Sequence, residues 1–219
     1  MYGMVSYGTY RCKITVLQAE VRPALLIKDR RKFHIRSYVV GMENLQSDDL
    51  LEVYVYNRHE ARIASEPVPS DEAGSRARLS HITNGATGDK TERVLIHEEP
   101  ELAKHDLQGK VELFIAQAFG KHFVPDLQRR VSMSAGQDDG NLPIRKFALA
   151  GLDLMVTEDF RIYLLEANIY PISPPQNTVD EDIQNHLIGF MKDLIDLVVG
   201  RPSVNFLSTT DILRKHNIQ

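Results

Sequence analysis

Several short stretches of the chain alternate hydrophobic and polar residues and are rich in β-branched and aromatic side chains, which predicts β-strands. These stretches are residues 13–21, 33–40, 50–56, 61–65, 147–156 and 161–167. Short polar segments separate the third stretch from the fourth and the fifth from the sixth. The pattern therefore predicts two β-hairpins, with turns at Asn57–Glu60 and Thr157–Asp159.

Two longer segments have apolar residues at helical spacing. Residues 99–119 predict one amphipathic helix, and residues 180–199 predict another that ends at Gly200, just before Pro202. The apolar side of the second helix is expected to face the core; it comprises Ile183, Leu187, Ile188, Phe190, Met191, Leu194, Ile195, Leu197 and Val198. The order of elements predicts an α/β or α+β protein, with a mainly antiparallel sheet covered by helices.

Composition restricts the class of protein further. The 219 residues are 42% hydrophobic, enough for a soluble globular chain with one large domain or two small ones. The single cysteine, Cys12, excludes an internal disulfide framework and favours a reducing compartment, so we expect a cytoplasmic protein. No apolar run approaches the roughly 18 residues of a membrane span, and no secretory signal is recognisable.

Charge is distributed unevenly along the chain. The formal net charge of −4 gives no general attraction to nucleic acid, and none is expected as a partner. Between Arg22 and Arg36, however, six cationic side chains stand against one acid. This run predicts a surface that attracts acidic partners.

The stretch "FRIYLLEANIYP", residues 160–171, predicts a buried strand through Ile162, Leu164 and Leu165 that ends in polar residues. Glu166 and Asn168 are two positions apart and so share one face of a strand. The predicted hairpin brings Asp153 opposite them. Two carboxylates and an amide oxygen are ligands that Mg²⁺ accepts while it keeps water or phosphate oxygens in its other positions. A simpler interpretation is a solvated strand end that turns at Asn168.

A second group of polar residues lies in "KFHIR". Lys32, His34 and Arg36 share one face of the predicted strand, and Arg62 on a later strand can add another cation. Such a face is often only solvated. Beside a carboxylate–Mg²⁺ site, though, Arg and Lys side chains are what a triphosphate requires, and they suggest phosphoryl transfer.

These stretches together resemble the tubulin-tyrosine ligase family of the ATP-grasp superfamily. The resemblance rests on "KFHIRSYVV", "LEVYVYNRHEARIASEP", "LSHITNGA" and "FALAGLDLMVTEDFRIYLLEANIYP", in the family's order, and covers about residues 14–199. It implies an α+β, ATP-grasp-like C-terminal domain at residues 22–200. Residues 1–21 would form the end of the central domain and the hinge strand, and residues 201–219 a tail. The N-terminal domain and part of the central domain are expected to be missing from the chain.

The resemblance also implies roles for individual residues. Gln18, Glu20 and Val21 would frame the adenine. Lys32, Arg36 and Arg62 would contact the phosphates, the two arginines as catalytic residues. The rest of the nucleotide pocket would be formed by His34, His81, Ile82, Thr83, Asn84 and Leu165, and Mg²⁺ would be held by Asp153, Glu166 and Asn168. Two positions depart from the family pattern: Ala19 replaces a hinge lysine, and His34 replaces an acid.

The reaction implied by the resemblance is ATP-dependent and proceeds through an acyl phosphate. A protein carboxylate takes the phosphoryl group of ATP, and the amine of a free amino acid then displaces phosphate to form an amide. The expected acceptor is an acidic, tubulin-like tail, and the expected protein is a cytoplasmic monomer, with cytoskeletal association open. Two alternatives remain: a truncated or degenerate, non-catalytic binding module, and an ATP-grasp ligase for small amino acids or peptides.

Overall fold

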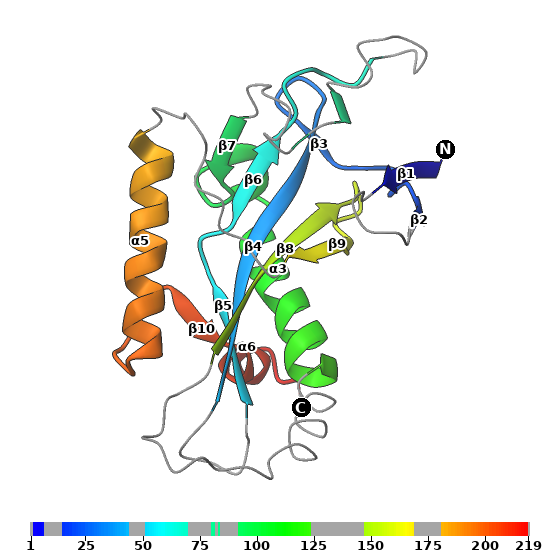
Figure 1. The fold of residues 1–219 in the computed structure, drawn as a ribbon. Helices are drawn as coiled ribbons and strands as arrows, with labels where there is room; N and C mark the ends of the chain where they lie inside the picture. The colour runs from blue at the N-terminus through cyan, green and yellow to red at the C-terminus, as the bar shows by residue number, and fades with distance from the viewer. Residues whose placement is uncertain are drawn as a thin grey trace.

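The structure is a computed structural model that describes residues 2–6, 15–43, 51–69, 80, 81, 83, 92–123, 147–168 and 181–218. Two sheets are present in these residues (Figure 1). A two-stranded ribbon pairs β1 (Tyr2–Ser6) with β2 (Thr15–Ala19). An eight-stranded sheet forms the centre of the molecule and carries the candidate site.

The long strand β4 (Arg31–Glu43) organises the larger sheet. One of its edges pairs with β8 (Phe147–Val156), and the other with both β5 (Leu51–Tyr56) and β6 (Glu60–Ile63). The predicted hairpin between β5 and β6 is therefore wrong. The two strands lie end to end along β4, because the segment between them breaks the register without reversing the direction of the chain.

Four short strands complete the sheet. They are β3 (Leu26–Ile27), β7 (Glu92–Leu95), β9 (Ile162–Asn168) and β10 (Phe206–Ser208). They pair with β4, β6, β8 and β5 respectively, and every pairing is antiparallel. The predicted α+β class with a mainly antiparallel sheet is confirmed. Strand β10 and the helix that follows it lie in the segment expected to be a tail.

The predicted helix 99–119 is interrupted. It divides into α2 (Pro100–Ala103), α3 (Leu107–Ile115) and a π-helical segment η2 (Ala116–Phe123). Asp106 has a left-handed backbone with φ 49°, which an α-helix cannot contain, so the break falls just before α3. The other helices are α5 (Glu181–Val198), close to its predicted bounds, and α6 (Thr209–Lys215).

The helices cover the two faces of the sheet separately. One face packs Ile35, Val39 and Leu154 against Leu107 and Val111 of α3, with further residues from α2 and α6. In Figure 1, α3 and α6 lie on one side of the sheet and α5 on the other. The alternation along β4 sends odd-numbered residues into this first core and even-numbered residues to the opposite face.

The second core lies under α5. Phe190 is fully buried, with its ring centroid 4.6 Å from Tyr38, 4.9 Å from Tyr56 and 6.0 Å from Phe206. These rings join helix α5 to strands β4, β5 and β10. Aromatic contacts of this kind add to the free energy gained by burial. They fix the position of α5 beside the polar end of β4.

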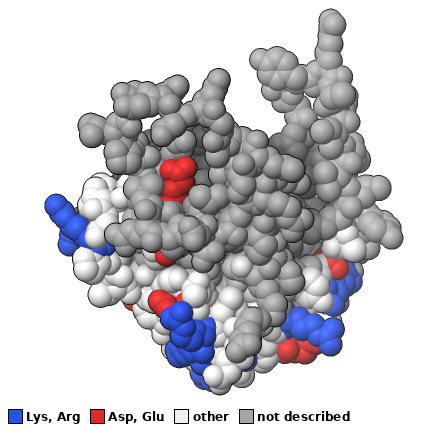
Figure 2. All heavy atoms as spheres, turned by 90° about the horizontal axis from the view of Figure 1, so that it is seen from below, with Lys and Arg blue, Asp and Glu red and all other residues white. Residues whose placement is uncertain are grey.

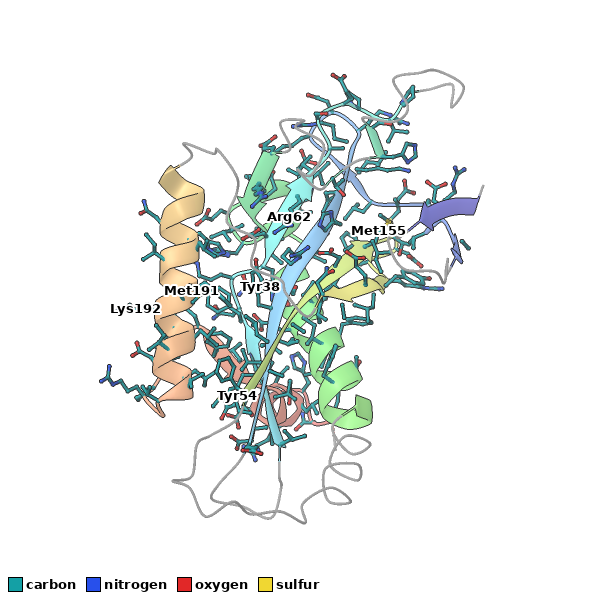
Figure 3. The ribbon with its side chains drawn as sticks, in the orientation of Figure 1. Tyr38, Tyr54, Arg62, Met155, Met191 and Lys192 are labelled. Carbon is teal, nitrogen blue, oxygen red and sulfur yellow. The ribbon has the colours of Figure 1, made fainter. Side chains whose placement is uncertain are left out.

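Part of the predicted core face of α5 is exposed. Ile188 and Ile195 are 67% and 55% exposed, and Met191 is 38% exposed. Figure 3 shows Met191 and Lys192 on this helix. The prediction that all the apolar residues of α5 face the core is therefore wrong, because a single sheet surface contacts only one side of a helix.

Charges on the surface are mixed. On the face drawn in Figure 2, Lys and Arg form separate small groups with Asp and Glu beside several of them. Arg214 pairs with Asp211 at 2.7 Å on α6, and both side chains are largely exposed. No helix among the described residues is long and apolar enough to cross a membrane.

Candidate functional site

The β8–β9 hairpin forms as predicted and brings the three expected metal ligands together. Asp153 pairs across the strands with Glu166, and Gly151 with Asn168. The register shifts beside Asp153, so that Leu165 is an extra residue on β9. Because of this bulge, Glu166 and Leu164 do not follow the simple alternation of a regular strand. The polar end of β9 is thereby directed to the side of Asp153.

The expectation that β9 is buried is wrong. Tyr163 is 42% exposed and Leu164 39% exposed, and Glu166 is also exposed. The reason is the position of β9, which pairs with β8 alone among the described strands. An edge strand lacks a second neighbour, and its side chains are covered less completely.

The end of the hairpin carries two carboxylates and an amide, residue types whose oxygens Mg²⁺ accepts. The Asn168 Nδ2 lies 3.3 Å from Asp153 Oδ2 and 3.1 Å from Glu166 Oε1, so a single amide bridges both carboxylates. No group of three or more His, Cys, Asp or Glu side chains in the described residues is arranged for a metal. A Mg²⁺ ion here would be held by the two carboxylates, with water or phosphate oxygens completing its shell, and by the Asn168 oxygen once the amide turns its nitrogen away from Asp153 and Glu166.

Arg36 is held by Asp153 in a buried, two-pronged ion pair. Its Nε donates to Oδ1 at 2.6 Å and its Nη2 to Oδ2 at 2.9 Å. Burial opposes ionisation of Asp153, but the hydrogen bonds from Arg36 and the electrostatic effects of His34 and Arg36 together outweigh it, and the pKa of Asp153 lies below its ordinary value. The carboxylate is thus ionised and oriented, as a metal ligand must be.

His34 is not a cation in this site. Burial lowers its pKa to about 4, and Arg62 and Arg36 lower it further against the opposing effect of Asp153. Its Nδ1 lies 2.5 Å from Thr83 Oγ1 and its Nε2 3.5 Å from Asp153 Oδ1. Neutral His34 therefore links the expected nucleotide residue Thr83 to the expected metal site.

Lys32 lies in a neighbouring group with two other predicted nucleotide residues. Its Nζ donates to Glu20 Oε1 at 2.6 Å and lies 2.9 Å from His81 Nδ1. Although burial works against ionisation, the hydrogen bonds from Lys32 and Arg22 lower the pKa of Glu20 to about 2. Glu20, whose backbone is expected beside the adenine, thus engages through its side chain the lysine expected at the phosphates.

Several predicted residues fall wholly or partly outside this geometry. Ile82 and Asn84 lie outside the described residues, as does the side chain of Gln18. The backbone of Gln18, in β2, pairs with Gly3 of β1. Val21 is partly buried just after β2. None of these positions tests the predicted roles, which remain predictions.

Arg62 belongs to a buried cluster that sequence reasoning missed in part. Arg62 lies opposite His34 on one side and Arg93 on the other, and its Nη2 is 3.3 Å from Glu60 Oε2. The Nε2 of His186 on α5 lies 3.1 Å from Glu60 Oε1. Burial would raise the pKa of Glu60, but His186, Arg62 and Arg93 lower it to about 2. In "EARI", polar and apolar residues alternate, which places Glu60 on the same face of the strand as Arg62 and could have indicated that Glu60 belongs to this cluster.

The basic run from Arg22 to Arg36 is largely neutralised. Arg22 and Lys32 pair with Glu20, Lys28 pairs with Glu92 and Glu99, Arg31 pairs with Glu92, and Arg36 pairs with Asp153. Among the described residues, only the side chain of Arg30 in this run has no carboxylate partner. The run is therefore a weaker attractor of acidic partners than its sequence suggests.

Comparison with known proteins agrees with the resemblance seen in the sequence. Residues 21–202 match the model of the tubulin-tyrosine ligase family. The chain belongs to this family. The match contains the whole of β4, the β8–β9 hairpin and α5, and so includes Lys32, Arg36, Arg62 and the Asp153–Glu166–Asn168 group of this tubulin-tyrosine ligase family member.

A relative among the curated proteins is tubulin polyglutamylase ttll-4 of Caenorhabditis elegans. It is 24% identical to this chain over 201 residues, which are 84% of the chain and 31% of the relative. The chain thus spans less than a third of the length of that relative.

Proposed function

We propose that this chain is part of an ATP-dependent carboxylate–amine ligase that adds an amino acid to an acidic protein acceptor. The observation that carries the proposal is the convergence of Asp153, Glu166 and Asn168 beside Arg36. Family membership and the relative described as a tubulin polyglutamylase support a protein ligase with a tubulin-like acceptor. An ATP-grasp fold is part of the same proposal.

The proposed roles follow from the contacts. Asp153, Glu166 and Asn168 would hold Mg²⁺, which when bound neutralises the phosphate charge. Arg36 orients Asp153 and contributes positive charge next to it. Lys32, four residues before Arg36 on the same face of β4, would exchange its contact with Glu20 for a phosphate oxygen. Arg62, the cross-strand neighbour of His34, would supply a further guanidinium.

The proposed reaction has two steps. A carboxylate oxygen of the acceptor forms a bond to the γ-phosphorus of ATP while the bond to the ADP oxygen breaks. The neutral amine of the incoming amino acid then attacks the acyl carbon, inorganic phosphate leaves, and the amine loses a proton. Stabilisation of charge on the transferring phosphoryl group accounts for most of the catalysis in such reactions.

Calorimetry of ATP binding with and without Mg²⁺ tests the proposal. We expect Mg²⁺-dependent binding by the chain and a loss of about tenfold or more in affinity for Glu166→Gln. Glu158→Gln is the matched control, because Glu158 is an exposed acid on the turn of the same hairpin. Absence of ATP binding by the unmodified chain would refute the ligase proposal, and equal effects of the two variants would refute the metal assignment.

A non-catalytic binding module is the second candidate, and one observation favours it. The charges of the site satisfy one another without a nucleotide, since Arg36 holds Asp153 and Lys32 holds Glu20. This candidate predicts no release of ADP in the presence of ATP, an amino acid and an acidic peptide. Mg²⁺-dependent release of ADP under those conditions excludes it.

A further inference from the structure

A cavity of about 610 Å³ is lined by residues of the sheet and of α5. Its lining includes Arg58, Glu60, Arg93, Glu98, Glu99 and Gly189. They come from the β5–β6 junction, from β7, from the turn that precedes α2, and from α5. Residues from four separate parts of the chain thus form one cavity.

The cavity adjoins the candidate site through a cross-strand row of charges. Glu60 on β6 lies directly opposite Arg36 on β4, and Arg36 lies directly opposite Asp153 on β8. Cross-strand neighbours are about 5 Å apart at Cβ. A chain held in the cavity can therefore place a carboxylate near the proposed phosphoryl-transfer site.

The buried acids of the cavity already have partners. Glu60 contacts Arg62 and His186, and Glu99 pairs with Lys28 at 3.0 Å. Glu98 is 60% exposed at the margin and lies 3.6 Å from His97. The negative charges facing the cavity are thus either neutralised within the protein or solvated.

The two arginines of the cavity, unlike its buried acids, are not paired with other side chains among the described residues. Neither Arg58 nor Arg93 makes a side-chain hydrogen bond or ion pair within the part of the chain that the structure describes. The Nε of Arg58 is buried without a hydrogen-bond partner, which is unfavourable for a charged donor. Burial and the neighbouring Arg62 lower the pKa of Arg93 against the opposing effect of Glu60. A bound anion would relieve both conditions.

We propose that this cavity binds the glutamate-rich segment of the protein acceptor, with side-chain carboxylates of that segment on Arg58 and Arg93. A planar guanidinium forms paired hydrogen bonds with a carboxylate, and two such groups select a ligand with more than one carboxylate. A free amino acid fits less well, because its ammonium group needs an acid, the buried acids are already engaged, and Glu98 is solvated at the margin. This inference rests on the proposed ligase function for the identity of the acceptor.

Peptide binding by the whole chain, measured by calorimetry without nucleotide, tests the inference. The probe is a short oligoglutamate with both termini blocked, compared with the matching oligoglutamine and with free glutamate. We expect binding of the oligoglutamate alone. Equal binding of oligoglutamine would overturn the inference, and equal or tighter binding of free glutamate would assign the cavity to the donor amino acid instead.

Variants locate the binding. We expect Arg58→Gln and Arg93→Gln each to weaken oligoglutamate about tenfold or more. Arg30→Gln is the matched comparison, since Arg30 is also an arginine without a carboxylate partner among the described residues but does not line the cavity. An equal loss for Arg30→Gln would mean that general attraction, and not the cavity, binds the peptide.

Gly189→Leu tests the cavity without changing any charge. A Cβ at Gly189 would meet no atom within 4 Å, so a leucine fits on α5 and occupies part of the cavity. Replacement of a helical glycine also favours the helix, so folding is not at risk. We expect weaker oligoglutamate binding with an equal or higher thermal unfolding temperature. Unchanged binding would overturn the inference even if the arginine variants fail to fold.

Failure of the inference is distinguishable from failure of the proposed function. Mg²⁺-dependent ATP binding without oligoglutamate binding leaves the ligase proposal intact and removes the acceptor cavity. Oligoglutamate binding with the expected variant pattern, but without ATP binding, leaves the cavity and removes the ligase proposal.

Discussion

Arg36 and Asp153 form a buried two-pronged ion pair across strands β4 and β8, with contacts of 2.6 and 2.9 Å. Removal of one member leaves the other as an uncompensated charge in a buried position, which costs more than the pair itself contributes. This pair connects the stability of the central sheet with the orientation of the expected metal ligand.

The first prediction concerns this pair. We expect Asp153→Ala and Arg36→Leu each to lower the free energy of unfolding by about 3–5 kcal/mol, and the double variant to lose clearly less than their sum. Urea unfolding measures all three. Asp211→Ala removes an exposed acid that pairs with Arg214 and should cost less than about 1 kcal/mol. Additive losses would show that the two side chains are not coupled.

The second prediction concerns the buried acid Glu60. Its pKa is depressed from 4.5 to about 2, so its stabilising contribution is present above pH 4.5 and is lost as the pH falls toward 2. We expect Glu60→Gln to be less stable than the unmodified chain at pH 7, with the difference shrinking by about 2 kcal/mol at pH 3. Urea unfolding at both pH values measures this. Glu158→Gln, at an exposed position, should show no such trend.

The third prediction concerns His59, which is fully buried. Neither ring nitrogen has a hydrogen-bond partner among the residues that the structure describes, and burial lowers the pKa of His59 to about 3. The unfolded chain therefore binds an extra proton below pH 6.5, and the folded state loses about 1.4 kcal/mol per pH unit between 6.5 and 3.

Replacement of His59 by leucine removes this coupling between protonation and unfolding. We expect His59→Leu to be as stable as the unmodified chain or more stable at pH 7, since an unsatisfied polar group is removed. At pH 4.5 its advantage should increase by about 2–3 kcal/mol. Thermal and urea unfolding at the two pH values measure the change. Parallel pH profiles would show that His59 is not buried as a neutral ring.

The fourth prediction concerns the attachment of α5. Phe190 is fully buried among Tyr38, Tyr56 and Phe206, and we expect Phe190→Ala to lower the free energy of unfolding by about 3–5 kcal/mol. Ile188, two positions earlier, is 67% exposed, and Ile188→Ala should cost well under 1 kcal/mol. Similar costs for the two variants would contradict the orientation of the helix.

Local patterns allowed much of the fold to be predicted. The β8–β9 hairpin and α5 follow from short-range signals: alternating residues around a polar turn, and a helical period that ends at Gly200. The juxtaposition of Asp153 with Glu166 and Asn168 follows from the hairpin alone. These predictions hold because neighbouring segments of the chain determine them.

Predictions that depended on contacts between segments far apart in the sequence were less successful. The segments 50–56 and 61–65 have the pattern of a hairpin, yet β4 pairs with both and keeps them in line. The exposed residues of β9 and α5 have the composition of core segments, but a sheet edge and the outer side of a helix leave them uncovered. Strand β7 was not predicted, and with it Arg93 was missed.

The sequence by itself determined the family, the antiparallel class of the sheet and the identity of the residues at the polar ends of β4, β8 and β9. These depend on residue type and local spacing. Only the tertiary structure decided which charges are engaged. Arg36 holds Asp153 and Lys32 holds Glu20, while Arg58 and Arg93 face a cavity without a hydrogen-bond or ion-pair partner among the described residues. Strand pairing and helix packing set these contacts between segments far apart in the chain, and their distances determine the electrostatic energies.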